Sequence, residues 1–438
     1  MTSRKEVPPG LSGPGLLAGR RGAAILIVGV LALAFNLRAA ITSLPPIFPE
    51  LESALHLSAA SLSLLAAIPV LCFGVVSGTG SPLSRRFGEE RVLGAALVLL
   101  AAGLVLRGVA ASALLFPGTI VAGGAIALMN VLLPSLVKRR MPEKAGLVIG
   151  LYLLMLSAGA IVASLAAVPV YNAAGDGTTS GSASVRVALS LWALPALLAA
   201  VLWIPQLRHR TTPFSPRRAG ESPSRAAGSG RPGLLALSRS ALAWQVTLFM
   251  GLQSLSYYAT LSWFPTMFRE RGVTAVHAGD LLALMNLGNA VTCLLVPVLA
   301  HRAANQSKLA VATVAVTGAG LAGAIFGGSG PSLVGFILLL GLGQGAALGL
   351  AVFYTMARAH DAVAAASLSA FAQAIGYLLA STGPLTVGFL HNATGGWTVP
   401  GIVLLAVTAV ELVVGLLAGR ARTVELGTGQ VVPAPAGG

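Results

Sequence analysis

Twelve apolar runs, each long enough for one helix to cross a lipid bilayer, constrain this chain more than any other feature. A spanning helix needs about 20 mostly apolar residues. Only 9% of the 438 residues are charged, whereas soluble domains carry roughly 25%, so a series of soluble domains is excluded. We therefore predict an all-α polytopic membrane protein with twelve transmembrane helices. The runs lie near residues 23–47, 60–80, 91–110, 114–137, 145–170, 186–205, 241–265, 278–300, 308–328, 332–356, 363–389 and 399–419.

The basic residues predict the direction in which the spans run. If the N-terminus is cytoplasmic, 23 of the 28 Lys and Arg residues lie in inner segments, and only Arg186, Arg269 and Arg271 lie in outer segments. Cytoplasmic loops of membrane proteins carry an excess of Lys and Arg. We therefore expect both termini in the cytoplasm. The net charge of +15 is attributed to this topology, and we expect no nucleic-acid partner.

The longest polar segment lies at the middle of the chain. Residues 206–240 are rich in Pro, Ser, Gly and Arg, a composition that does not form a packed core. We expect a cytoplasmic linker between two six-helix halves. The predicted organisation is an N-tail (1–22), an N-terminal half (23–205), the linker (206–240), a C-terminal half (241–419) and a C-tail (420–438).

Motifs along nearly every span resemble one known family. The motifs are AFNLRAAITSLPPIFPEL (34–51), IPVLCFG (68–74), SRRFGEERVL (84–93), MNVLLPSLVKRR (129–140), WALPALLAAVLWIP (192–205), WQVTLFMGLQSLSYYATLSWFPTM (244–267), GLGQG (341–345), FAQAIGYLLASTGP (371–384) and GFLHNATGGWT (388–398). Taken in this order, they resemble the cyanate/2-nitroimidazole transporter family within the major facilitator superfamily. The resemblance implies the major facilitator fold, a bacterial cytoplasmic membrane location, and a secondary carrier that moves a small solute by alternating access.

Arg38 is the outstanding polar residue within a span. It lies 17 residues after Arg21, roughly 25 Å along a helix, and a central Arg costs about 2.5–3.5 kcal/mol on insertion scales. We expect a fixed cation that binds an anionic or strongly polarised solute, because its planar fork suits planar groups. The alternative is a structural pairing with backbone carbonyls or with Glu50. Asn36 is expected either in the same cavity or in hydrogen bonding to a neighbouring helix.

Other polar side chains lie at similar depth in the apolar runs. In the fold that the resemblance implies, spans one, four, seven and ten line the central cavity, and solute sites of such carriers lie near the midplane. For each single residue, hydrogen bonding between helices is the alternative. The predicted solute-binding residues are Arg38, Asn36, Asn130, Gln253, Tyr257, Gln344 and Gln373.

Two carboxylates are candidates for proton coupling. Glu50 lies at the outer end of span one, and Glu411 lies deep in span twelve. Neither belongs to a chain of acidic residues and histidines such as proton relays use. We expect a structural role for Glu411 and a proton that travels with the solute.

A short inner loop between spans two and three carries Arg85, Arg86 and Arg91 beside Glu89 and Glu90. We predict that the three arginines act as a gate whose charges pair in one conformation and separate in another. The alternative is that they only mark the cytoplasmic side. The loop lacks the Asp that precedes the basic pair in many relatives.

The sequence contains no pattern of a catalytic or metal site. The sequence has two cysteines, and both lie inside apolar runs. Two are too few for a disulfide framework or a metal cluster. No phosphate-binding G-x-x-x-x-G-K-[ST] loop is present, which disfavours an ATP-driven pump. We expect no enzyme activity, no cofactor, no metal and a monomer in the bilayer.

The sequence thus predicts a secondary active transporter for a small anionic or polar solute of the cyanate-like or nitroimidazole-like class. We expect uptake by alternating access, coupled to protons. An exporter of drugs or metabolites with the same fold is the alternative, although the Gly-Pro pair typical of span five in drug/proton antiporters is absent. A membrane enzyme or scaffold is a remote alternative.

Overall fold

The computed structural model describes residues 20–76, 79–109, 112–175, 181–208, 237–303, 306–328, 330–424 and 431–433. Eleven helical segments among them are long and apolar enough to cross a membrane. A further helix, α12 (Ala241–Glu270), has 30 residues and carries more polar side chains. Together these helices occupy the twelve apolar runs of the sequence, which confirms the predicted fold class.

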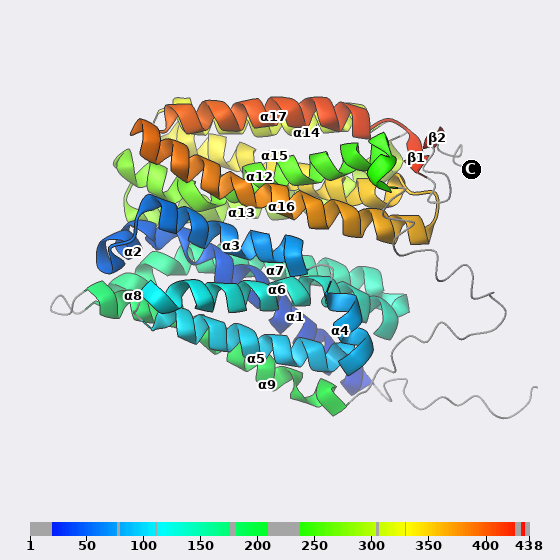
Figure 1. The fold of residues 1–438 in the computed structure, drawn as a ribbon, viewed down its shortest axis with the longest axis horizontal. Helices are drawn as coiled ribbons and strands as arrows, with labels where there is room; N and C mark the ends of the chain where they lie inside the picture. Colours follow the sequence, from blue (N-terminus) through cyan, green and yellow to red (C-terminus); the bar gives the residue numbers. More distant parts are fainter. Residues whose placement is uncertain are drawn as a thin grey trace, which may run out of the picture.

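The helices form two bundles that lie against each other (Figure 1). The N bundle contains α1 (Arg20–Thr42), η1 (Pro45–Ile47), α2 (Phe48–Leu55), α3 (Ala59–Val76), α4 (Gly80–Phe87), α5 (Glu89–Gly108), α6 (Ser112–Arg140), η2 (Pro142–Lys144), α7 (Ala145–Ala173), α8 (Gly181–Ser190), α9 (Ala193–Trp203) and η3 (Ile204–Arg208). The C bundle contains α12, α13 (Ala275–Arg302), α14 (Ser307–Phe326), α15 (Pro331–Ala357), α16 (Ala362–Thr394) and α17 (Thr398–Ala418).

Successive long helices run in opposite directions, so α1 begins and α17 ends at the same end of the molecule (Figure 1). We call this end the inner face, following the distribution of basic residues, and the opposite end, where α2 lies, the outer face. The predicted linker, 206–240, and both predicted tails lie largely outside the described residues.

Two prolines end α1 near the outer face. Pro45 and Pro46 lack the N–H that an α-helix interior needs, and the chain continues as the buried 3-10 turn η1. The turn leads into α2, which closes at His56 with a left-handed φ of 51°. This break places Glu50 of α2 at the outer surface instead of along the line of α1.

The apolar core shows where the bundles join. One cluster combines the N bundle with the outer parts of the C-bundle helices, including Phe264, Met285 and Val387. A second cluster holds only the inner parts of the C bundle with Leu237 and Val424, and includes Tyr354. The bundles therefore share a core toward the outer face and have separate cores toward the inner face. This arrangement closes the outer side.

Small residues allow the bundles to approach. Across the bundle interface, α3 packs on α16 and α7 packs on α13. A Cβ atom on Gly279 of α13 would lie 2.7 Å from the carbonyl oxygen of Ser164 of α7. A Cβ on Gly388 of α16 would overlap the hydroxyl of Ser63 of α3. Glycine at helix crossings permits this close backbone contact.

A strand pairing that the sequence did not predict lies at the inner end of the C bundle. Strand β1 (Arg422–Val424) pairs antiparallel with β2 (Val431–Pro433). The N–H of Val424 donates to the carbonyl of Arg358 at 2.9 Å, and His360 donates back to Val424 at 3.3 Å. The chain that follows α17 is thereby attached to the turn between α15 and α16.

Candidate functional site

Arg38 reaches from α1 of the N bundle to α12 of the C bundle. Its Nη1 donates to the hydroxyl of Tyr257 at 2.5 Å. The guanidinium carbon lies 5.0 Å from the centre of the Tyr257 ring and 6.0 Å from that of Tyr258. Guanidinium groups are attracted to aromatic faces at such distances. The cation is therefore held at the junction of the two bundles.

The Tyr257 hydroxyl has a second partner in α13. It donates to Oδ1 of Asn286 at 2.8 Å, and Nδ2 of Asn286 donates to the carbonyl of Leu282 at 2.9 Å. Both side chains are buried, whereas Arg38 is half-buried. Arg38 is thus the most exposed of the three residues in this network.

More aromatic groups surround the cation. The side chains of Tyr377 on α16 and Cys293 on α13 lie within electrostatic range of Arg38. The Phe73 ring of α3 lies 5.3 Å from that of Tyr377 and 6.5 Å from that of Tyr258. These residues supply rings and a thiol but no charge.

The N bundle completes the site through Tyr152 of α7. Its hydroxyl donates to Oδ1 of Asn130 of α6 at 3.1 Å, and the ring lies within electrostatic range of Arg38 and Tyr377. In the part of the chain that the structure describes, no carboxylate pairs with Arg38. The site can therefore hold an anion or the negative end of a polar solute beside an uncompensated cation.

Of the predicted solute-binding residues, the structure brings Arg38 and Tyr257 into contact, and Asn130 is connected to this region only through its bond to Tyr152. Asn36 lies elsewhere: its Nδ2 donates to the carbonyls of Ala32 at 2.8 Å and of Pro195 in α9 at 3.1 Å. This is the hydrogen bonding between helices that the sequence left open as an alternative.

The three glutamines also bond to neighbouring helical groups. Gln344 of α15 is buried and donates to Thr260 of α12 at 3.1 Å. Gln253 is buried and donates to the carbonyl of Met250 and to the Ser254 hydroxyl. Nε2 of Gln373 donates to Ser369, one turn earlier in the same helix, at 2.8 Å. The structure therefore does not bring these amides into the Arg38 network.

The two proton-coupling candidates lie in different surroundings. Glu50 does not pair with Arg38, because its Oε2 accepts a hydrogen bond from Arg269 at 2.7 Å. Glu411 of α17 is fully buried, and neither of its carboxyl oxygens has a hydrogen-bond partner among the described residues. An ionised carboxylate in that environment is very unfavourable, so the neutral acid fits this packing.

The inner-face arginines that were predicted as a gate are exposed. Arg85 and Arg86 lie on α4, and Arg91 lies in the first turn of α5. The neighbouring acids are instead buried against the end of α6. There, Glu89 forms an ion pair with Arg139, and Glu90 forms one with Arg140 at 3.6 Å. Both ion pairs stay within the N bundle.

Sequence reasoning missed several members of the site. The missed residues are polar or aromatic side chains within apolar runs, namely Tyr258, Asn286, Tyr377, Tyr152 and Cys293. The adjacent pair Tyr257-Tyr258 and the polar Asn286 in span eight were the only available signals. Which of them faces the centre depends on how the helices pack.

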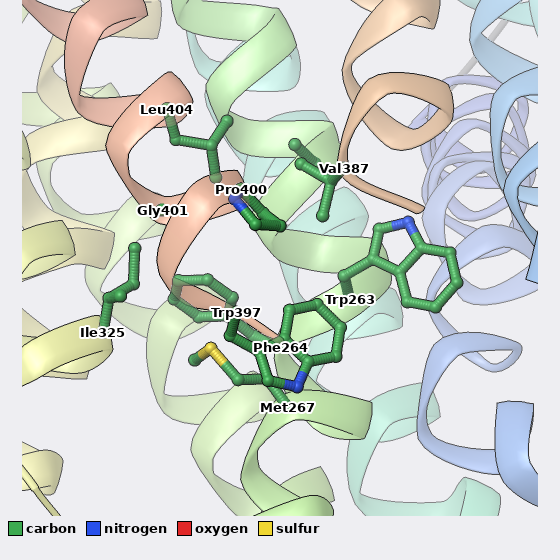
Figure 2. Close-up of a pocket in the computed structure, with 10 residues that line it drawn as sticks. Trp263, Phe264, Met267, Ile325, Val387, Trp397, Pro400, Gly401 and Leu404 are labelled. Carbon is green, nitrogen blue, oxygen red and sulfur yellow. The ribbon is translucent and has the colours of Figure 1, made fainter. Parts of the chain in front are cut away.

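A small apolar pocket lies apart from this site, toward the outer face of the C bundle (Figure 2). Its volume is about 10 Å³, the lower limit for one water molecule. Side chains of α12, α14, α16 and α17 line it, among them Phe264, Ile325 and Val387. It offers no charged group to a solute.

A family model, related proteins and solved structures all match this chain. The family model "Major Facilitator Superfamily" matches residues 26–381. The chain is 37% identical to the 2-nitroimidazole transporter of Escherichia coli, covering 92% of this chain and 97% of that protein. It is 29% identical to the cyanate transport protein CynX of the same organism, covering 85% and 91%.

A further relative and two solved structures extend the comparison. The chain is 38% identical to the uncharacterized transporter YycB of Bacillus subtilis, covering 91% of this chain and 94% of that protein. A bacterial homologue of the human lysosomal transporter Spinster has a similar fold, with a TM-score of 0.78 at 13% identity and coverage of 92% and 98%. The D-xylose-proton symporter follows with a TM-score of 0.70 at 17% identity and coverage of 92% and 97%.

These matches confirm the family resemblance that the sequence motifs predicted. They also exclude the membrane enzyme and the scaffold, because the family consists of transporters. The chain is a multi-pass membrane protein of the Major Facilitator Superfamily, related within it to the 2-nitroimidazole and cyanate transporters.

Proposed function

We propose that the protein takes up a small anionic or polar solute, of the cyanate-like or nitroimidazole-like class, at Arg38. The observation that supports this most is the guanidinium of half-buried Arg38, which contacts Tyr257 across the bundle junction and has no carboxylate partner among the described residues. Its remaining N–H groups are free to form charge-assisted hydrogen bonds, which are shorter and stronger than neutral ones.

Tyrosine rings around the cation favour a planar solute. Arg38 packs on Tyr257 and Tyr258, and the ring of Phe73 contacts those of Tyr258 and Tyr377 nearby. A planar nitro or carboxyl group would match the fork of the guanidinium, and the linear cyanate ion could accept from it through its terminal atom. Two relatives are named as transporters of 2-nitroimidazole and of cyanate, and these names support this class of solute.

The transport cycle follows from the way the bundles meet. They share a core at the outer face and have separate inner cores, which supports a conformation in which solute reaches Arg38 from the inner face. Rocking of one bundle against the other would expose the site to the outer face. With both termini in the cytoplasm, as the basic residues predict, this conformation releases solute into the cell.

A solute gradient or a proton gradient must drive accumulation, because the sequence has no nucleotide-binding loop. We propose that the proton enters with the solute in its neutral acid form. Glu411 then keeps a structural role, and Glu50 serves the outer closure. The carrier works as a monomer in the bacterial cytoplasmic membrane.

Uptake into proteoliposomes tests the proposal. Purified wild-type protein and the Arg38→Ala variant are reconstituted and offered radiolabelled cyanate and 2-nitroimidazole in parallel. We expect uptake of at least one of them by the wild type, inhibited by unlabelled solute of the same class, and none by Arg38→Ala. Export without uptake in vesicles of known orientation would instead favour the exporter.

A further inference from the structure

A chain of hydrogen bonds connects the α13 backbone to Arg38. Nδ2 of Asn286 donates to the carbonyl of Leu282 at 2.9 Å, and the Tyr257 hydroxyl donates to Oδ1 of Asn286 at 2.8 Å. Nη1 of Arg38 then donates to that hydroxyl at 2.5 Å. The chain therefore runs from the C bundle to the cation on the N bundle.

The chemistry of each group fixes the direction of this chain. A backbone carbonyl only accepts and a guanidinium only donates. Since Leu282 takes the amide N–H of Asn286, the amide oxygen is left to accept from Tyr257. The single hydroxyl proton of Tyr257 is then used, and its lone pair faces Arg38.

Burial separates the role of Asn286 from that of Arg38. Asn286 is 3% exposed and Tyr257 is 4% exposed, whereas Arg38 is half-buried. A solute in the site would meet the guanidinium, while Asn286 lies behind the tyrosine. Its influence on the solute therefore passes through Tyr257.

We propose that Asn286 is a positioning residue for the solute, because it orients the Tyr257 hydroxyl that anchors one nitrogen of Arg38 and leaves the other N–H groups directed at the solute. This inference rests on the proposed function of Arg38. Without Asn286 the hydroxyl rotates freely, and its proton competes for the space in which Arg38 donates. The guanidinium then loses its fixed orientation over the tyrosine ring.

Replacement of Asn286 by leucine tests the role through the affinity for the solute. We expect Asn286→Leu to raise KM for the transported probe by up to about tenfold, the upper end of what one lost neutral hydrogen bond costs, with little change in kcat. The probe is radiolabelled cyanate or 2-nitroimidazole, whichever the wild type takes up. Asn289→Leu is the matched control, since Asn289 lies in the same helix, is also buried, and is not part of this chain.

Two further variants distinguish positioning from general damage. In Asn286→Thr, the hydroxyl can donate to the carbonyl of Leu282 four residues earlier, as threonines in helices do, and can accept from Tyr257. This variant should recover most of the lost affinity. Asn286→Leu should add nothing in a Tyr257→Phe background, because both changes interrupt the same chain. Additive effects of the two changes would overturn the positioning role.

A readout that needs no solute uses Cys293, which lies within electrostatic range of Arg38. In a Cys72→Ser background, the rate of Cys293 alkylation by iodoacetamide reports on the nearby cation, since a cation promotes the reactive thiolate. We expect Arg38→Ala and Asn286→Leu to change this rate and Asn289→Leu to leave it unaltered. An unchanged rate in Asn286→Leu would contradict the proposal, while wild-type uptake by Arg38→Ala would instead contradict the proposed function.

Discussion

Arg269 of α12 and Glu50 of α2 form an ion pair across the outer ends of the two bundles, with Nη1 and Oε2 2.7 Å apart. The same Nη1 donates to the carbonyl of Pro46 at 3.3 Å. Their side chains are 22% and 14% exposed, and pairs near water contribute only about 0–1 kcal/mol. A contact of this strength can close the outer face and still break in every cycle.

We predict that Arg269→Gln shifts the protein toward the outward-open conformation, by no more than about fivefold in population. The reason is that the substitution removes the positive charge that Arg269 contributes to the ion pair with Glu50. The apolar contacts between the bundles stay in place. Reaction of a cysteine at Ser262, which is buried near the outer face, with an impermeant reagent measures the shift. Arg271→Gln is the matched control, because Arg271 donates to the Ala324 carbonyl within the C bundle.

The charge-reversed pair Glu50→Arg with Arg269→Glu should restore the closed outer face. Each single reversal places like charges together and should increase labelling at Ser262→Cys. Equal labelling of the single and double reversals would show that the ion pair does not hold the outer face closed.

We predict that Arg38→Ala abolishes uptake and that Arg38→Lys retains only part of it. A lysine supplies a point charge without the planar fork, and it cannot cover the Tyr257 ring in the same way. Uptake rates in proteoliposomes measure both effects, with thermal stability of the purified variants as the folding control. A stable Arg38→Ala protein with wild-type uptake would remove Arg38 from the solute site.

We predict that uptake rises as the external pH falls and that Glu411→Gln keeps this dependence. A proton that enters with the solute is more abundant at low external pH, and Glu411 is buried without a partner among the described residues. Initial rates at several external pH values test this. If Glu411→Gln still exchanges solute but has lost its pH response, α17 contains the proton path.

We predict that a cysteine at Ser222 is cytoplasmic. This position lies outside the described residues, in the Arg-rich segment 206–240 that the charge distribution assigns to the inner side. Impermeant maleimide should label Ser222→Cys only after the inner side is opened. Labelling in intact cells would show that the predicted topology is wrong. The assigned direction of solute release would then also be wrong.

The positions of the helices could be predicted because the bilayer sets their length. Every apolar run is helical in the structure, although α1 ends at Thr42, before the predicted end of the first run at residue 47. That Arg38 has a polar partner could also be inferred, since a charge at that depth is too unfavourable without one, and the structure supplies Tyr257.

The partners of these residues could not be predicted, because they depend on how the helices rotate in the bundle. Asn286 and Gln344 are alike as isolated amides in apolar runs, yet one joins the Arg38 network and the other bonds to Thr260. Arg269 meets Glu50 across 219 positions of sequence. No local pattern encodes contacts of that kind.

The absence of a side chain at Gly388 makes the closed outer face possible, and it also offers a way to control the protein. A Cβ there would overlap Ser63 of the opposite bundle and approach the Trp263 ring to 2.5 Å. A bulky residue at this position would act as a wedge that holds α3 and α16 apart. One substitution would then provide a sample enriched in the outward-open conformation, against which conformation-specific antibody fragments could be selected.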